Sequence, residues 1–157
     1  MPALVSVRNG PFRDVSRTLV RRWGGRMLRC LDLTKVELSI ALTDDSEIRE
    51  LNRVFRHRNR ATDVLAFAMR EGEPLPHSQE ILGDVVISVE TARRQAGRHR
   101  RTLEAEVCML LAHGLLHLVG YDHKSERDAA VMTAATRRLC RAATATSTRP
   151  ASRKAAR

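Results

Sequence analysis

The 157-residue chain is long enough to bury one hydrophobic core, and its length predicts a single domain that needs no disulfide bonds for stability. Its three cysteines, Cys30, Cys108 and Cys140, lie far apart and form no CxxC pair, which argues against a disulfide framework or a thiolate metal site. No apolar run approaches the roughly 20 residues that span a bilayer, and residues 1–7 show no secretory leader. We therefore expect a soluble protein of the reducing cytoplasm, without membrane contact.

The first half of the chain predicts two strands and two helices. Residues 3–8 form a short strand pattern, and residues 14–31 place apolar side chains three and four positions apart, as a helix does. Residues 36–42 alternate apolar with small or polar residues and predict a second strand. The segment 44–54 predicts a helix whose start is marked by the capping-box spacing of Asp44 and Glu47. A polar loop is expected at residues 56–60, with Arg56 in it.

The second half adds two strands and three helices. Residues 62–67 predict a strand and residues 71–80 a surface loop, while residues 81–88 are apolar enough for a central strand. Helices follow at 88–96, at 102–119, where the pattern is apolar almost all round, and at 126–140. This order predicts an α+β domain over residues 1–141, with a small mixed four-stranded sheet packed against about five helices.

The formal charge of +10 is concentrated at the C-terminal end. Residues 141–157 contain no acid and five basic residues, namely Arg141, Arg149, Arg153, Lys154 and Arg157. These five leave +5 on residues 1–140, so charge alone does not separate a nucleic-acid partner from an ordinary solvated surface. Residues 142–157 lack apolar periodicity and predict a disordered basic tail.

Three of the six histidines fall within residues 113–123. His113 and His117 are four apart, so on a helix both imidazoles leave the same face, as two ligands of one metal ion must. Gly120 can end the helix and turn His123 back toward the same ion. Three protein ligands leave a fourth tetrahedral position open, which is typical of a catalytic zinc site, and we expect one Zn²⁺ per chain. Ordinary hydrogen-bonded histidines are the alternative, but an apolar helix offers their nitrogens few partners.

The residue after His113 separates this motif from that of the zinc metalloproteases. Their HExxH motif places a glutamate there as general base, whereas this chain has Gly114. The usual peptidase mechanism therefore lacks its base. A metal ion can still lower the pKa of a bound water to about 7, and a cationic side chain beside it would suit attack on a phosphodiester.

Several blocks of the sequence together resemble the YbeY family of bacterial endoribonucleases, which act in ribosomal RNA maturation. The resemblance rests on residues 113–123, on Leu51-Asn52 with Phe55-Arg56, on 62–67 and on 82–88, and it covers roughly residues 36–123. It implies a zinc-dependent, single-strand-selective endoribonuclease of 16S rRNA 3′-end maturation and ribosome quality control. It also implies a metalloprotease-like (zincin-like) fold, and as partners rRNA and the small ribosomal subunit or its assembly factors, with no DNA.

The same resemblance assigns residues to the site. It implies that His113, His117 and His123 bind the zinc, and that Arg56 is a catalytic residue with His113, set in a cleft near the metal. A guanidinium there can fork onto a phosphate oxygen. Ala66 departs from the family, which usually has serine at that position. Two other functions stay open: a noncatalytic rRNA-binding assembly factor with a structural zinc, and a metalloprotease-like hydrolase of another substrate.

Overall fold

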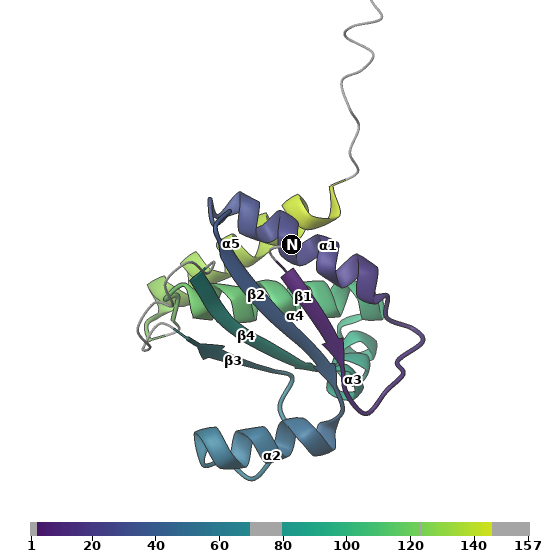
Figure 1. Ribbon diagram of the computed structural model, residues 1–157. Coiled ribbons are helices and arrows are strands. Elements are labelled where there is room, and N and C mark those ends of the chain that lie inside the picture. The colour runs from purple at the N-terminus through teal and green to yellow at the C-terminus, as the bar shows by residue number, and fades with distance from the viewer. Residues whose placement is uncertain (1–2, 70–79, 123, 146–157) are drawn as a thin grey trace, which may run out of the picture.

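The computed structural model describes residues 3–69, 80–122 and 124–145, whose helices and strands are arranged as shown in Figure 1. Their order along the chain agrees with the order expected from the sequence. In sequence they are β1 (Ala3–Val7), α1 (Arg17–Cys30), β2 (Val36–Thr43), α2 (Asp45–Arg56), β3 (Val64–Ala68), β4 (Glu80–Ser88), α3 (Val89–His99), α4 (Leu103–Leu118) and α5 (Glu126–Thr144).

The four strands form one mixed sheet in the order β1-β2-β4-β3. β1 is parallel to β2 and β2 is parallel to β4, whereas β3 runs antiparallel to β4 at one edge. The apolar strand β4 is therefore central, as its sequence predicted. The α+β fold class with a mixed four-stranded sheet and five helices is confirmed.

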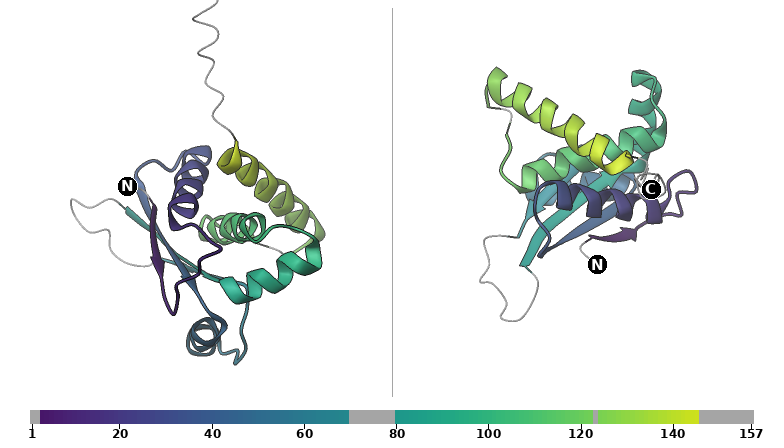
Figure 2. Two further views of the ribbon diagram at one scale, coloured as in Figure 1. Left: turned by 90° about the vertical axis from the view of Figure 1, so that its right-hand side faces the viewer. Right: turned by 90° about the horizontal axis from the view of Figure 1, so that it is seen from above.

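The two faces of the sheet are covered unequally, because successive strand residues point to opposite faces. Ile40 and Ile87 belong to the large core that α1, α4 and α5 cover. Their neighbours in sequence, Ala41 and Val86, belong to a small cluster under Ile48 of α2. In the left-hand view of Figure 2, α4 lies end-on between the sheet and α5, while α2 lies on the other side. α4 is thus the central helix of the main layer.

Helix boundaries follow capping residues that the sequence displays. The Asp44 carboxylate accepts a hydrogen bond from the backbone N–H of Glu47 at 3.0 Å, and the Thr102 hydroxyl accepts one from the N–H of Ala105 at 3.1 Å. Each side chain satisfies a backbone donor that the first helical turn leaves without a carbonyl. These caps fix where α2 and α4 begin.

Two boundaries differ from the expected ones. α2 continues to Arg56 and ends at His57, which adopts a left-handed φ of 59°. Arg56 therefore lies in the last helical turn, and the prediction that it lies in a loop is wrong. α5 continues to Thr144 rather than ending near residue 140, because Ala143 is fully buried in the core. The remainder of the expected basic tail, 146–157, and most of the expected loop at 71–80 lie outside the described residues.

A carboxylate at the start of α2 ties this helix to α3. Both Ser88 and Thr91 donate hydroxyl hydrogen bonds of 2.6 Å to Asp45 Oδ1, and Arg94 donates one of 2.9 Å to Oδ2. Burial acts most strongly on the pKa of Asp45 and raises it. The hydrogen bonds from Ser88, Thr91 and Arg94 together outweigh burial, so this pKa lies below its usual value of 3.8. The native state therefore favours the charged carboxylate.

We expect Asp45→Asn to lower the free energy of unfolding by about 1–2 kcal/mol at pH 7, since hydrogen bonds to a charged group are lost. The folded-state pKa is depressed, so this stabilisation is present above the unfolded-state value near 3.8 and is lost as the pH falls through the folded-state value. Urea unfolding of both proteins at pH 7 and at pH 3 would measure the difference. An equal difference at both pH values would contradict a role for the charge.

Candidate metal centre and its surroundings

Two histidines stand on the partly exposed side of the most buried helix. α4 packs most of its residues into the core, whereas the side chains of His113 and His117 are only partly buried. Their Nε2 atoms are 3.2 Å apart, and their ring planes meet at 73° with centroids 4.8 Å apart. The four-residue spacing therefore brings the two ring nitrogens together, as the sequence predicted.

This separation can be compared with what a zinc ion requires. Zinc binds imidazole nitrogen at about 2.0–2.1 Å, so two nitrogens of a tetrahedral site stand ~3.4 Å apart. The observed 3.2 Å lies within a few tenths of an ångström of that value. Imidazole is also a preferred zinc donor. The pair on α4 therefore fits the zinc ion that the sequence predicts.

The chain turns sharply after these histidines. α4 ends at Leu118, and Gly120 adopts a φ of 101°, a backbone conformation that residues other than glycine rarely adopt. His123 lies outside the described residues, so its role as the third ligand stays a prediction. Within residues 3–69, 80–122 and 124–145, no group of three His, Cys, Asp or Glu side chains is placed to hold a metal ion.

The sheet fills the space that a side chain at residue 114 would need. A Cβ atom on Gly114 would lie 2.7 Å from Val85 Cγ1 and 3.2 Å from Val64 Cγ2. Val85 is fully buried in the core, so it has little room to move away. Helix–sheet packing therefore favours glycine here, and a glutamate side chain would force the helix or the sheet to shift.

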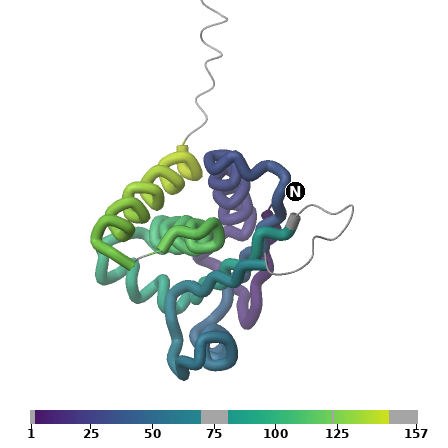
Figure 3. The backbone as a smooth tube through the Cα atoms, turned by 90° about the vertical axis from the view of Figure 1, so that its left-hand side faces the viewer, coloured from purple at the N-terminus to yellow at the C-terminus, as the bar shows by residue number. Residues whose placement is uncertain are grey.

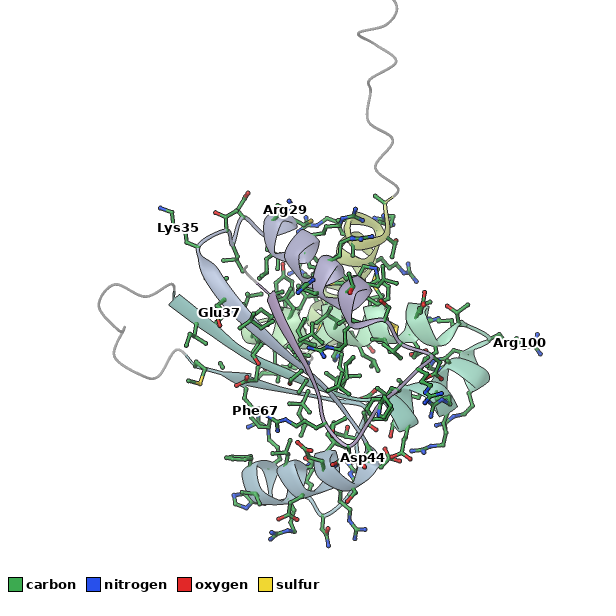
Figure 4. All side chains as sticks on the ribbon, turned by 45° about the vertical axis from the view of Figure 1, so that its right-hand side comes forward. Arg29, Lys35, Glu37, Asp44, Phe67 and Arg100 are labelled. Atoms are coloured by element: carbon green, nitrogen blue, oxygen red, sulfur yellow. The ribbon has the colours of Figure 1, made fainter. Side chains whose placement is uncertain are left out.

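Arg56 is held against the edge strand β3. Its Nη2 atom donates a 2.7 Å hydrogen bond to the carbonyl of Ala66, and its guanidinium carbon lies 5.0 Å from the centre of the Phe67 ring. Phe67 in turn meets Phe55 edge-on, with centroids 5.4 Å apart. Figure 4 shows Phe67 at the face of β3 that looks toward α2. Because the acceptor is a backbone carbonyl, alanine in place of serine at residue 66 leaves it intact.

Strand β3 lies between Arg56 and α4. Val64 lies against Gly114 of α4, and Gly83, the partner of Ala68, lies against Leu118. Ala66 stands between these two contacts along β3. Arg56 therefore bonds to β3 beside the segment of α4 between Gly114 and Leu118. This segment carries His117. The expected position of Arg56 in a cleft near the metal stays a prediction.

A cavity between α4 and α5 was not foreseen from the sequence. It has a volume of about 480 Å³, and His113 is one of the residues that line it. It is lined by Asp63, Arg101, Ala105, Met109, Leu110, His113, Met132, Thr133, Thr136, Arg137 and Cys140. Since these residues come from separate segments, only the packing of the helices brings them together.

A buried carboxylate near this cavity was also missed. Glu106 of α4 is completely buried, with His99 Nδ1 3.0 Å and Arg101 Nη1 3.6 Å from its Oε1 atom. Its Oε2 atom has no hydrogen-bond partner among the described residues. His99 is therefore paired with a buried carboxylate although its own side chain is about half exposed. The available clue was the basic run at residues 98–101 followed closely by Glu104 and Glu106.

Comparisons with known proteins agree with the sequence blocks. The family model described as "Endoribonuclease YbeY" matches residues 13–144. A protein of that name from Pelotomaculum thermopropionicum is 49% identical over 137 residues, covering 84% of this chain and 90% of the relative. One from Aquifex aeolicus is 48% identical over 112 residues, covering 71% and 73%. One from Myxococcus xanthus is 49% identical over 133 residues, covering 83% of this chain but 44% of that longer protein.

A solved structure supports the fold. The solution structure of a Thermotoga maritima protein superposes with a TM-score of 0.59 at 22% sequence identity, covering 89% of each chain. At this identity the match speaks for the fold alone. Separately, none of the helices in the described part of the chain has both the length and the apolar character needed to cross a membrane.

Proposed function

We propose, because the chain belongs to the YbeY family of endoribonucleases, that it hydrolyses single-stranded RNA at a zinc centre held by His113, His117 and His123. The observation that carries the proposal is the family match across residues 13–144. The converging Nε2 atoms of His113 and His117 support the metal assignment independently of that match. We further propose 16S rRNA 3′-end maturation and ribosome quality control as its role, with the small ribosomal subunit or its assembly factors as partners.

The chemistry divides between the metal and the residues around it. A zinc ion would act as a Lewis acid and would lower the pKa of a water molecule toward neutrality. Gly114 offers no carboxylate to accept a proton, so the site lacks the base on which peptide hydrolysis by HExxH enzymes depends. This absence favours a phosphodiester over a peptide as substrate.

Arg56 is the residue that we assign to the phosphate. A guanidinium has five N–H donors, and in the described part of the chain one of them meets the Ala66 carbonyl. This hydrogen bond and the Phe67 ring hold the group in place before substrate binds. The other donors can fork onto a phosphate oxygen and stabilise the negative charge that develops there. Arg58 and Arg60, exposed just beyond α2, can guide the RNA backbone without reading bases.

Cleavage of a labelled single-stranded RNA tests the proposal. Wild type, His113→Ala and Arg56→Ala would be purified in parallel without a histidine tag, and both variants should lose activity. Equal cleavage by all three would point to a contaminating nuclease. RNA binding without cleavage by zinc-loaded wild type would favour the noncatalytic assembly factor. Casein turnover that depends on His113 would favour the protease.

For Arg56→Ala we expect kcat/KM to fall about 10²–10³-fold, the usual loss when one donor to a transition-state charge is removed. Zinc content should stay unchanged, which separates this variant from the histidine variants. Arg56→Lys should recover only part of the loss, because an ammonium cannot fork onto phosphate and reach Ala66 together. Steady-state cleavage kinetics measure all three proteins.

The matched control is Arg53→Ala, about one turn earlier on the same helix. Arg53 pairs with Glu50 three residues earlier, and both side chains are exposed. Exposed pairs of this kind contribute little, so cleavage should change less than about twofold. A comparable loss in both variants would mean that general positive charge on α2, rather than the position of Arg56, supports cleavage.

The basic tail is expected to strengthen RNA binding without sequence preference. Removing residues 146–157 leaves α5 complete and deletes Arg149, Arg153, Lys154 and Arg157. Loss of four phosphate contacts would make the plot of log K against log salt less steep by up to about 3. Filter-binding titrations at several salt concentrations measure this slope. An unchanged slope would show that the tail does not contact RNA.

A further inference from the structure

The cavity between α4 and α5 has walls of two chemical kinds. Met109 and Leu110 of α4 face Met132 of α5 across it, and these side chains give it a mainly apolar interior. Arg101, just before α4, and Arg137 of α5 are exposed at its rim. Figure 3 shows α5 lying obliquely over α4 on the main face of the sheet. The cavity therefore suits a ligand with a flat or apolar body and an anionic end.

One rim arginine is fixed in place. Arg101 Nη1 lies 2.8 Å from the Met109 sulfur and 3.6 Å from Oε1 of the buried Glu106. These contacts hold the guanidinium over the cavity, although 44% of its side chain remains exposed. The Arg137 side chain, from the opposite helix, supplies the second positive charge. Together the two arginines offer a phosphate group donors from both walls.

Cys140 lines the cavity, and the buried Cys108 lies beside it. A hydrogen bond from Cys108, and the nearby charge of Arg101, lower the pKa of the Cys140 thiol against the opposing effect of burial. Asp63 is the acid among the described lining residues, and its carboxylate accepts hydrogen bonds from the Val64 N–H at 2.8 Å and from Gln95 at 3.2 Å. A carboxylate held in this way can accept a hydrogen bond from the exocyclic amine of a nucleobase.

We propose that this cavity is a nucleotide subsite, which receives the base of a nucleotide next to the cleaved phosphate while Arg101 and Arg137 bind its flanking phosphate. Three observations carry the assignment: the cavity reaches the His113 ring, its interior is apolar, and its rim is cationic. Its volume of about 480 Å³ lies in the range of small-ligand sites. An unpaired, unstacked strand can insert a base there, whereas a duplex cannot, so the subsite would favour single-stranded RNA. The proposal rests on the endoribonuclease function and adds where the substrate binds.

Two matched pairs of variants test the subsite. Thr133→Trp fills the cavity from an exposed position on α5, and its control Val131→Trp places the same ring two residues away at a position 53% exposed that does not line the cavity. Arg137→Glu reverses the rim charge, and its control Arg138→Glu reverses the neighbouring exposed charge. Thermal unfolding would confirm that all four variants fold.

The first measurement is binding of adenosine 5′-monophosphate and cytidine 5′-monophosphate to metal-free protein by calorimetry. We expect Thr133→Trp and Arg137→Glu each to weaken binding about tenfold or more, and their controls to change it less than about threefold. The second measurement is KM for a single-stranded RNA, which should rise in the same two variants with zinc content unchanged. Glutamate-rich peptides that bind in place of nucleotides would overturn the assignment in favour of a protein ligand.

The two proposals fail in different ways. If wild type cleaves RNA and the cavity variants behave like their controls, the subsite is wrong and the endoribonuclease function stands. If wild type binds nucleotides through the cavity but cleaves no RNA when loaded with zinc, the endoribonuclease function is wrong and the binding site stands. Absence of any nucleotide binding by metal-free wild type, up to millimolar concentration, would also overturn the subsite.

Discussion

His117→Ala should abolish both zinc binding and RNA cleavage. Removing one of two imidazoles whose Nε2 atoms converge to 3.2 Å leaves no pair of donors on α4. Since the ion supplies several kcal/mol of transition-state stabilisation, cleavage should fall at least ~10³-fold. Metal analysis of the purified protein should give about one zinc per wild-type chain and almost none per variant chain. His113→Ala should behave in the same way.

The control for this experiment must be a histidine outside the centre. His57 is exposed and ends α2 in a left-handed conformation that asparagine tolerates, so His57→Asn should keep zinc and activity. Thermal unfolding without metal should place His117→Ala near wild type, because the side chain is only partly buried. Full zinc content in His117→Ala would contradict the ligand assignment and leave the alternative of ordinary hydrogen-bonded histidines.

Local patterns predicted the elements and the histidine pair because each depends on residues close in sequence. The spacing of His113 and His117 fixes their common face as soon as the segment is helical. Arg56 was placed in a loop because the segment 56–60 is uniformly polar, whereas α2 includes Arg56 and ends at the left-handed His57. Ala143 extends α5 because the core covers it, a tertiary effect that composition does not show.

The parts that were not predicted depend on contacts between distant segments. Arg101 and Arg137 reach one cavity only through the packing of α4 against α5. Glu106 is buried although glutamate is usually exposed, and its partner His99 comes from α3. Arg56 is oriented by Ala66, ten residues later, on a strand whose own position depends on β4. Each of these placements requires the sheet register and helix packing to be known.

One side of α4 carries the two histidines, and the other side packs against the sheet at Gly114. His113 and His117 lie on the partly exposed side of the helix, while Gly114 faces Val85 and Val64 of the sheet. A close approach of helix to sheet at this point brings β3, and with it Arg56, level with the histidines. The missing side chain therefore has two consequences: no carboxylate follows His113, and the helix can lie close to Val64 of the edge strand.

Gly114→Ala should destabilise the protein even though alanine favours helices. Helix propensity would contribute ~1 kcal/mol in its favour. The added Cβ would stand 2.7 Å from Val85 Cγ1, and overpacking of a rigid core typically costs about 1–3 kcal/mol. Because Val85 is fully buried, we expect the upper end of that range and a net loss of about 1–2 kcal/mol. Urea unfolding monitored by circular dichroism measures it.

Gly25→Ala is the matched control, and Gly114→Glu the severe test. Gly25 lies within α1 with nothing within 4 Å of an added Cβ, so alanine there should stabilise by up to ~1 kcal/mol. Gly114→Glu restores HExxH, but it forces a charged side chain against the sheet, at a cost above ~4 kcal/mol that approaches the whole stability of a domain. We therefore expect insoluble or unfolded protein and no peptidase activity. Equal stability of Gly114→Ala and Gly25→Ala would show that the sheet yields at Val85.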